Sequence, residues 1–564
     1  MKHLFTFFFL LINLLSFSQK KYPQDYFRNP LDIPIFLSGS FGELRSNHFH
    51  AGLDIKTQGK EGLNVFAVAD GYVSRIKVQQ FGYGKTIYIT HPNGYTSVYG
   101  HLSKFNDEIE KYVKNIQYKK ENYETGNLFF KEDKFPVKKG EIIAFSGDTG
   151  GSGGPHLHFE LRDAKTEKVI NPLLFGIKVA DSRKPTIQSL KAYPLSADAR
   201  INQQKKSFQI PIKNLGNGKY MADRITASGT ISFGVSVFDR FNGMPNKNGI
   251  YSLAMFLNGK RFYYHDVETF SFSESKFLNL HIDYEHYKKY KRRYQKTFKE
   301  TANKLTTYEK LINNGKVNVQ KGMNYTVEIV AKDFEGNTSS IKIPVAGKES
   351  NAIFTAQKDT TNFKIEKKKF HKFTKDGITV AFPKNTFYKD LYLDFNVVND
   401  IAKIHSPTVP LDKSFTLTFN VSKYSEEEKE QLYIANLEYP KYPRYYYTRK
   451  KDSTFYTTTK TLGNYTLKFD KQKPKIRLLY FKNNQSLESS KTLKARISDV
   501  GSGIKSWRAT IDNEWILMQY NHKKGILTYN FNDKKLVGNK HIFKLVVSDN
   551  VGNTNTISAT FFKK

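Results

Sequence analysis

The sequence predicts a mostly β protein with several domains. Strand-like segments such as "TIYIT", "GVSVFD" and "FKLVVSD" recur along the whole length of the chain. The 36 Gly supply turn positions, and the 45 Phe and 35 Tyr supply cores, so the composition is not that of a disordered chain. At 564 residues, the chain has the length of roughly three to five domains.

The N-terminus has the pattern of a secretory signal peptide. The stretch "MKHLFTFFFLLINLLSFSQ" has a basic start, an apolar run and small residues at Ser16 and Ser18, which predicts a signal peptide over residues 1–18. We therefore expect an exported protein in the periplasm, cell envelope or extracellular space. No later stretch offers the about 18–20 apolar residues of a membrane span, so no transmembrane segment is predicted. The chain has no cysteine, which excludes disulfides and a lipidated N-terminal Cys.

The net charge of +36, from 89 Lys and Arg against 53 Asp and Glu, indicates an anionic partner. For an exported protein, we expect anionic envelope polymers and membrane surfaces rather than nucleic acid. A generally Lys-rich surface would give the same charge, so the charge alone identifies no function.

Residues 30–175 contain the densest turn chemistry and are predicted to form one β domain. "NVFAVADGYVSRIKV" is predicted to form two strands about an Asp70-Gly71 turn, and "TIYITHPNGYTSVYGHL" two more about Pro92-Asn93-Gly94. "PVKKGEIIAFSGDTG" and "HLHFELRD" add further strands. Between them, three apolar residues at helical spacing predict an inserted helix: Ile109, Val113 and Ile116.

Residues 183–347 and 472–564 look like two copies of one module. They open on "RKPTIQSL" and "QKPKIRLL", and both carry D-x-x-G-N near the end, in "AKDFEGN" and "VSDNVGN". Regular strands and turns favour Ig-like or fibronectin-like β-sandwiches. In the first copy, residues 283–312 are predicted to insert a long amphipathic helix with Tyr287, Tyr294, Phe298, Leu305 and Tyr308 on its apolar face.

Residues 353–470 are predicted to form another β domain, with "GITVAFPKNTFYKDLYLDF" as the strongest pair of strands. From residue 176 to the end, the sequence shows no catalytic constellation. Any chemistry is therefore expected in residues 30–175.

Six of the 14 histidines lie between residues 48 and 158, which suggests a metal site. In "GGPHLHFEL", a strand would place His156 and His158 on one face and Leu157 on the other. An H-x-H pair alone is more often only a polar strand face. In "NHFHAGLDI", however, His50 and Asp54 add two further donors of the kinds that catalytic zinc accepts. H-E-x-x-H is absent, which excludes the helical metalloprotease arrangement.

Three motifs in order resemble the lysostaphin/LytM-type zinc endopeptidases, which hydrolyse peptidoglycan. They are H-x-x-x-D, then Y-x-H-L about 45 residues later, then G-x-G-G-P-H-L-H-F-E, and the intervening strands follow the same pattern. The resemblance covers residues 42–175 and implies an antiparallel β peptidase domain. It also implies one zinc ion per chain, held by His50, Asp54 and His158, and catalytic roles for the non-ligand residues His101 and His156.

Other residues near these motifs have simpler interpretations. His48 has strand-like spacing to His50 but no carboxylate four residues later, and His91 precedes a turn. Glu160 shares a face with His158 but is no ligand in the resembling family, which leaves it a supporting or surface role. Asp70 is a turn residue.

The resemblance implies a secreted zinc metallo-endopeptidase that cuts peptide stems or cross-links of peptidoglycan. A non-hydrolytic envelope-binding or regulatory protein on the same fold is one alternative, although all five expected residues are kept. An adhesin whose sandwich domains matter most is another.

Overall fold

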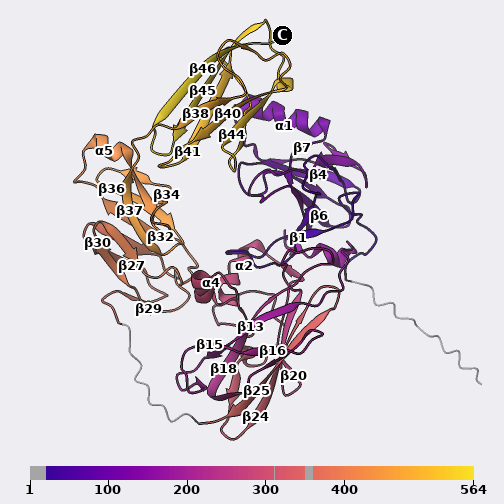
Figure 1. The fold of residues 1–564 in the computed structure, drawn as a ribbon, viewed down its shortest axis with the longest axis vertical. Coiled ribbons are helices and arrows are strands. Elements are labelled where there is room, and N and C mark those ends of the chain that lie inside the picture. The colour runs from indigo at the N-terminus through magenta and orange to yellow at the C-terminus, as the bar shows by residue number, and fades with distance from the viewer. Residues whose placement is uncertain (1–20, 310, 350–359) are drawn as a thin grey trace, which may run out of the picture.

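The computed structural model describes residues 21–309, 311–349 and 360–564, and strands dominate it (Figure 1). The prediction of a mostly β protein is therefore confirmed. The predicted signal peptide, residues 1–18, lies outside the described residues. Among the helices of the described ranges, none is both long and apolar enough to cross a membrane.

The first domain is an antiparallel sheet in the order β1-β2-β11-β6-β5-β4-β8, with a second, smaller sheet in the order β3-β10-β7. Leu157 and Phe159 lie in its core with no exposed surface, as the alternation in "HLHFE" predicts. The predicted hairpin at Pro92-Asn93-Gly94 forms between β5 and β6. The elements are β1 (Leu37–Gly39), β2 (Leu53–Lys56), β3 (Asn64–Phe66), β4 (Gly71–Val78), β5 (Lys85–Thr90), β6 (Tyr95–Leu102), β7 (Lys104–Phe105), α1 (Asp107–Lys120), β8 (Gly126–Phe129), β9 (Pro136–Val137), β10 (Ile142–Phe145), β11 (His156–Asp163), β12 (Val169–Ile170) and the 3-10 turn η1 (Pro172–Phe175).

The helix predicted after His101 is present as α1. The Asn106 side chain caps its first turn by accepting a hydrogen bond from the Ile109 backbone N–H, at 3.1 Å. Ile109 and Val113 face the core and are 1% exposed, which matches the predicted periodicity. The helix ends at Glu121 in the left-handed conformation.

The second domain has β18 as its longest strand, paired with β13 on one side and meeting β25 on the other. Its sheet runs in the order β15-β13-β18-β25-β24-β19-β20. The elements are β13 (Thr186–Pro194), β14 (Arg200–Ile201), β15 (Phe208–Ile210), β16 (Ile212–Asn214), β17 (Lys219–Ala222), β18 (Ile225–Phe238), β19 (Ser252–Leu257), β20 (Lys260–Asp266), β21 (Thr269–Phe270), α2 (Phe272–Ser275), α3 (Leu278–His281), α4 (Tyr284–Tyr290), β22 (Gln295–Lys296), η2 (Asn313–Gly315), β23 (Val317–Val319), β24 (Asn324–Lys332) and β25 (Thr338–Gly347).

The long helix predicted over residues 283–312 is wrong. Among the described residues of this range, only α4 is helical, and the chain leaves it at Lys291 in the left-handed conformation (φ 58°). The residues beyond it form β22, which pairs with β18 at Gly234 and Val235. Tyr294 and Phe298 are buried as predicted, but their backbone is not helical, because pairing with β18 outweighs local periodicity.

The segment between β20 and β22 (residues 267–294), which includes the start of the predicted insertion and is called the insertion from here on, also packs against the first domain. Its strand β21 pairs with β12, and Phe270 and Leu278 are fully buried in the core of the first domain. The insertion therefore joins the first two domains through a shared interior.

The third domain consists mainly of two five-stranded sheets, β27-β28-β32-β36-β35 and β30-β31-β37-β33-β34, around one core. Its elements are β26 (Lys364–Ile365), β27 (His371–Lys375), β28 (Ile378–Phe382), β29 (Leu391–Tyr392), β30 (Phe395–Val398), β31 (Ile401–Ile404), β32 (Phe415–Asn420), α5 (Glu426–Gln431), β33 (Leu432–Asn436), β34 (Arg444–Tyr446), β35 (Arg449–Lys451), β36 (Thr454–Thr459) and β37 (Gly463–Phe469).

The fourth domain consists of sheets β38-β40-β44-β43 and β39-β46-β45-β41-β42, with a core of its own. Its elements are β38 (Lys475–Leu479), β39 (Gln485–Ser486), β40 (Thr492–Ser498), β41 (Ile504–Ile511), β42 (Glu514–Trp515), β43 (Gln519–Asn521), β44 (Ile526–Asn530), the 3-10 turn η3 (Phe531–Asp533), β45 (Lys540–Asp549) and β46 (Thr554–Phe562).

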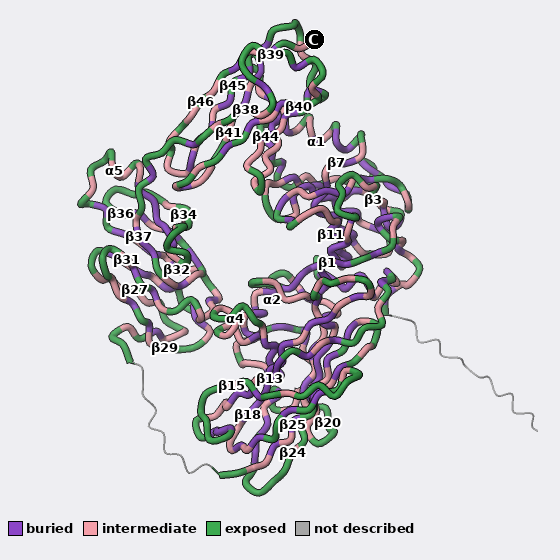
Figure 2. The backbone as a smooth tube through the Cα atoms, in the orientation of Figure 1, coloured by how far each residue is buried: buried purple, intermediate pink, exposed green. Residues whose placement is uncertain are grey.

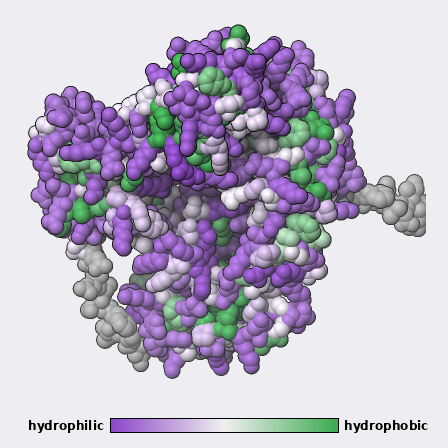
Figure 3. Space-filling view, turned by 45° about the horizontal axis from the view of Figure 1, so that its top comes forward, coloured by the Kyte–Doolittle hydropathy of each residue, from purple (hydrophilic) through white to green (hydrophobic). Residues whose placement is uncertain are grey.

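The domains follow one another around a ring, and the fourth returns to lie beside α1 of the first (Figure 1). Burial is concentrated inside each sheet pair rather than between the sides of the ring (Figure 2). The space-filling view is mostly hydrophilic, with small scattered hydrophobic patches and a hollow at its centre (Figure 3).

Candidate metal centre

The pairing of β2 with β11 sets Asp54 directly opposite His158 on neighbouring antiparallel strands. Opposite residues of such a pair present their side chains to the same face about 5 Å apart. On the other side of β11, His158 is opposite Gly100, which has no side chain to crowd the imidazole. The sheet register therefore brings together two donors that are 104 residues apart in sequence.

His50 reaches the same point from the tight turn before β2. Its backbone N–H donates to Glu43 and its carbonyl accepts from Gly42, both at 2.9 Å. Gly52 then carries the chain into β2 so close to β11 that a Cβ would lie 2.3 Å from the Phe159 carbonyl oxygen. Close approach, rather than a turn, is what requires glycine at this position.

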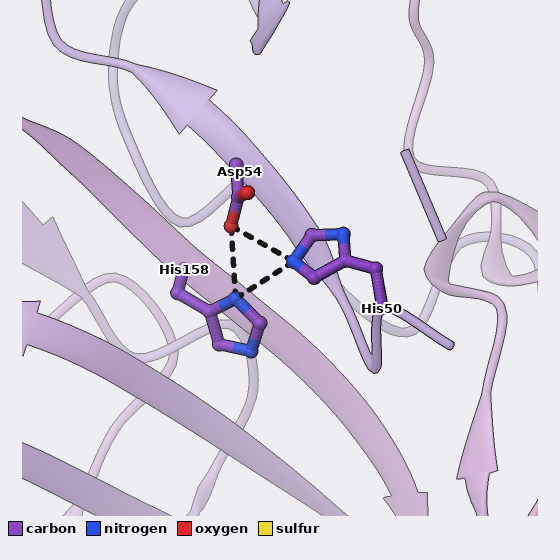
Figure 4. Close-up of side chains that lie close together, drawn as sticks. All are labelled: His50, Asp54 and His158. Atoms are coloured by element: carbon purple, nitrogen blue, oxygen red, sulfur yellow. Dashed lines mark hydrogen bonds and ion pairs between the residues drawn. The ribbon is translucent and has the colours of Figure 1, made fainter. Parts of the chain in front are cut away.

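Three donor atoms converge into a triangle (Figure 4). The distance from Asp54 Oδ1 is 3.0 Å to His50 Nε2 and 2.9 Å to His158 Nδ1, and the two nitrogens are 3.2 Å apart. Tetrahedral zinc with bonds of about 2.0–2.1 Å sets its ligand atoms about 3.3 Å apart. The triangle therefore has the size of one face of a zinc coordination tetrahedron, and the buried group is consistent with a zinc site.

In each of the two imidazoles, the nitrogen that faces away from Asp54 is hydrogen-bonded, which leaves the nitrogen nearer Asp54 unprotonated. His50 Nδ1 lies 2.8 Å from the Ser40 carbonyl oxygen, so it carries the proton and Nε2 keeps its lone pair. His158 Nε2 lies 2.8 Å from Glu160 Oε1, so the lone pair is on Nδ1. Both lone pairs point to Asp54, which is the arrangement that a divalent metal requires.

Electrostatics keep the carboxylates of this region ionised. Burial would raise the pKa of Asp54, but the interactions with His50, His156 and His158 outweigh it and hold that pKa well below its usual range. Burial likewise opposes ionisation of Glu160, yet Arg162 and His158 lower its pKa to about 2. Without a metal, burial would lower the pKa of His158, but its bonds to Asp54 and Glu160 raise it to about 9.

His101 and His156 lie beside the triangle as a pair, with ring centroids 4.7 Å apart. His101 Nδ1 is 2.8 Å from the Thr149 carbonyl oxygen, and His156 Nδ1 is 2.8 Å from that of Gly154. Both rings therefore carry the proton on Nδ1 and leave Nε2 free, and His156 Nε2 is 3.4 Å from Asp54 Oδ1. Burial, then the charges of His158 and His156, lowers the pKa of His101 to about 3, which keeps it neutral at neutral pH.

His101 is the second-last residue of β6. Its φ of 63° lies in the left-handed region, which is unusual for a histidine. A non-glycine residue in this region costs of order 1 kcal/mol of backbone strain. The conformation turns the imidazole out of the strand toward His156. The structure thus brings together all five site residues named from the sequence: His50, Asp54, His101, His156 and His158.

His48 and His91 lie apart from the site. His48 is exposed and contacts Asn47. His91 is more than a turn residue, since it is 2% exposed and bonds the Asp70 carbonyl and Ser97 Oγ. Asp70 accepts a hydrogen bond from the Lys139 backbone N–H at 2.7 Å, which is a loop contact.

Sequence reasoning missed three supporting residues. Arg45 donates to Asp54 Oδ2 at 2.9 Å, and Arg162 donates to Glu160 Oε2 at 2.7 Å. The Tyr83 ring lies 4.7 Å from that of His158, and its hydroxyl donates to Glu160. The alternation that placed Glu160 on the His158 face could also have placed Arg162 there.

Two family models match the chain. Peptidase family M23 matches residues 48–118, which include three of the five site residues, and the Zu5-like domain matches residues 362–470 in the third domain. The M23 match agrees with the lysostaphin/LytM resemblance of the N-terminal motifs.

Curated relatives match the same region. The DD-carboxypeptidase/endopeptidase Mpg of Neisseria meningitidis is 30% identical over 158 residues, which is 28% of this chain and 30% of that protein. An uncharacterized metalloprotease of Haemophilus influenzae is 36% identical over 124 residues, 22% of this chain and 20% of that protein. The chain thus spans less than a third of the length of these relatives.

Among solved structures, the catalytic domain of lysostaphin from Staphylococcus simulans is 25% identical. The match covers 25% of this chain and 90% of that one, with a TM-score of 0.19.

Proposed function

The chain carries a peptidase family M23 domain near its N-terminus, and from this we propose that it is a zinc metallo-endopeptidase of the cell envelope. Its proposed substrates are peptide bonds in the stems or cross-links of peptidoglycan. The observation that carries the proposal is the buried His50, Asp54 and His158 triangle with two further imidazoles beside it.

The residues around the triangle have the protonation states that peptide hydrolysis needs. A zinc ion held by His50, Asp54 and His158 would supply a Lewis acid that polarises a scissile carbonyl. His101 and His156 both keep a free Nε2 that can accept a hydrogen bond from a water beside the triangle. The low pKa of His101 suits it to orienting this water, while His156 can take the proton and pass it to the leaving amine. Once protonated, His156 can donate a hydrogen bond to a developing oxyanion.

The alternative is a non-hydrolytic envelope-binding or regulatory protein on the same fold. Such a protein would have no need for a pair of proton-accepting imidazoles next to a metal-sized triangle. The retention of all five residues in bonding positions favours the enzyme.

We further propose that the protein is exported, and that the β domains serve as spacers or wall-binding modules. The Lys-rich surface would favour contact with anionic envelope polymers. On this proposal the second and fourth domains are Ig-like sandwiches, since each opens and closes on the same sequence motifs.

Digestion of purified peptidoglycan tests the proposal. The zinc-loaded chain should release soluble muropeptides with newly exposed amines, a chelator should stop the release, and added zinc should restore it. His158→Ala should be inactive, while the matched variant His48→Ala should retain activity because His48 lies outside the site. A zinc-loaded protein that binds peptidoglycan but releases nothing would instead establish the non-hydrolytic alternative.

A further inference from the structure

The D-x-x-G-N motif of the second and fourth domains has a structural role outside the metal centre. In the second domain, the Asn337 backbone N–H and Nδ2 donate to the two oxygens of Asp333, both at 2.8 Å. In the fourth, Asn553 donates in the same way to Asp549, at 2.9 and 2.8 Å. Each motif therefore fixes the orientation of one carboxylate at the end of a long strand.

In both domains this carboxylate meets two more aspartates. Within each group, one oxygen per residue lies within 4.8 Å of the others. The members are Asp181, Asp239 and Asp333 in the second domain, and Asp470, Asp499 and Asp549 in the fourth.

The two groups occupy equivalent places in the fold. The first aspartate of each group precedes the first strand of its domain, β13 or β38. The second directly follows the strand that pairs with it, β18 or β40. The third lies at the end of a later long strand, β24 or β45. β13, β18 and β24 lie in one part of the ring in Figure 1. The first aspartate of each group lies just after the preceding domain, at the point where the chain enters the second or the fourth domain.

Two buried oxygens of the group in the second domain have no hydrogen-bond donor, although Asn337 and the Arg183 backbone N–H bond other oxygens of the group. Asp239 is 1% exposed, yet its Oδ1 has no hydrogen-bond donor, and Asp181 Oδ2 is also buried without one. None of the three carboxylates has a Lys, Arg or His partner within 4.0 Å among the described residues, in a chain with 36 more basic than acidic side chains. A buried charge without a partner is costly, so this arrangement points to a missing cation.

The closeness of the three carboxyl groups changes their pKa values. Burial first, and then the neighbouring Asp181 and Asp333, raises the pKa of Asp239 to about 8. Glu335 adds further negative charge beside Asp181. A cation of charge +2 between the three oxygens would remove this repulsion.

We propose that Asp181, Asp239 and Asp333 bind a calcium ion that ties the segment entering the second domain to the ends of β18 and β24. All donors are oxygens, the ligand type that Ca²⁺ prefers, and zinc would favour nitrogen or sulfur. One oxygen of each residue lies within 4.8 Å of the others, so a single ion with bonds of about 2.3–2.6 Å can contact all three.

The proposal is confined to this group. In the fourth domain, Asp499 Oδ1 is also buried without a donor, but Asp499 is partly exposed, unlike Asp239, and its Oδ2 accepts from the backbone N–H groups of Gly501 and Gly503. Asp470 Oδ2 likewise accepts from Ser502 at 2.6 Å.

Calorimetric titration of Ca²⁺ into the full, zinc-loaded chain tests the site. We expect binding with a Kd of roughly 10⁻⁴–10⁻³ M, the range of many extracellular calcium modules, and a higher melting temperature with calcium. Asp239→Asn should lose one calcium equivalent and the rise in melting temperature while keeping its zinc. Asp198→Asn, the same change at an exposed position of the same domain, should bind like the parent chain.

The melting temperature without calcium distinguishes a calcium site from a cluster of aspartates that only stabilises the fold. Without calcium and at about pH 9, above the raised pKa of Asp239, Asp239→Asn should melt at the same temperature as the parent or higher, because it removes one of three repelling charges. Asp181→Asn should behave in the same way if Asp239→Asn does not fold. Equal calcium binding by the parent and both Asn variants, or no binding by the parent, would overturn the proposal.

Discussion

At the scale of single residues, the metal centre separates two kinds of histidine that the sequence places side by side. His158 presents Nδ1 to Asp54, whereas His156 turns its Nε2 toward the open side of the triangle. Their different hydrogen-bond partners, Glu160 and Gly154, fix this division.

We therefore expect different losses from the two alanine variants. His158→Ala should lose both zinc and activity, because it removes one of three ligands. His156→Ala and His101→Ala should keep one zinc per chain and lose turnover by roughly 10²–10⁴-fold, the usual contribution of acid–base groups. Metal analysis beside peptidoglycan digestion checks this. A zinc-free His156→Ala beside a zinc-replete His158→Ala would reverse the assignment.

Glu160 offers a subtler test, since it bonds the proposed metal ligand His158 and is not itself one of the three proposed ligands. Glu160→Gln keeps the volume but removes the charge that orients His158 Nε2, and loss of such a partner weakens metal binding by roughly 10–100-fold. Competition with a zinc chelator measures the change. Glu141→Gln, an exposed position of the same domain, should show none, and an unchanged affinity in Glu160→Gln would mean that packing alone orients His158.

At the scale of elements, strand periodicity predicted the site better than helix periodicity predicted the insertion. The alternation of side chains predicted for "HLHFE" is present because β11 pairs with a neighbouring strand along both of its edges. The spacing of Tyr294 and Phe298 reflected burial but not a helix, because β22 pairs with a strand far away in sequence. The register of Asp54 opposite His158 could not be read from either segment alone, since long-range pairing sets it.

The insertion also contributes His281 of α3 to a buried pair of stacked imidazoles with His265 of β20, and their ring centroids are 4.3 Å apart. Tyr308 and Gln295 bond His281, and Lys296 is the nearest charge. Burial lowers the pKa of His281 to about 4 and that of His265 well below its usual value, so both rings are neutral in the folded protein.

This pair should make the insertion sensitive to acid. Unfolded histidine binds protons below about pH 6.5, whereas folded His281 does so only below about pH 4, so stability is full above pH 6.5 and falls as the pH drops between these values. For His281 alone, we expect a loss of about 2 kcal/mol between pH 7 and pH 5. Hydrogen-exchange protection of the α3 amides, corrected for intrinsic rates, should fall about 30-fold.

Two variants check the origin of this acid sensitivity. His281→Gln should flatten the pH dependence, and His371→Gln in the third domain should leave it unchanged. A profile equally steep in His281→Gln would assign it to other groups.

At the scale of the whole molecule, the ring closes where the fourth domain meets the first. Lys523 bonds Asp148 at 2.7 Å, Lys114 bonds Asp533 at 2.6 Å, and Trp515 packs edge-on against Tyr118. Asp148 directly precedes Thr149, whose carbonyl holds His101. The closure is therefore next to the loop that positions one of the site histidines.

Breaking these ion pairs should open the ring. Partly exposed pairs contribute roughly 0.2–1 kcal/mol each, so Lys114→Glu with Lys523→Glu should raise the open population several-fold or more. Small-angle scattering should then report a larger radius of gyration, and the parent chain should expand in the same direction at about 1 M salt, where screening is strong. Lys534→Glu, which breaks a pair inside the fourth domain, should leave the radius unchanged. A constant radius in the double variant would show that the remaining contacts hold the closure, among them the Arg508–Glu121 ion pair and the hydrogen bond from Gln80 to the Tyr520 carbonyl.

Because both partners of this closure belong to one chain, its strength depends on the effective concentration that the intervening domains impose. Contacts too weak to hold two separate proteins together suffice here. The same surfaces are complementary between molecules, so an opened chain can offer its fourth domain to the first domain of a second chain. Concentrated protein at low salt would then exchange domains into closed dimers, with the loop that holds His101 in each chain bordered by the fourth domain of its neighbour.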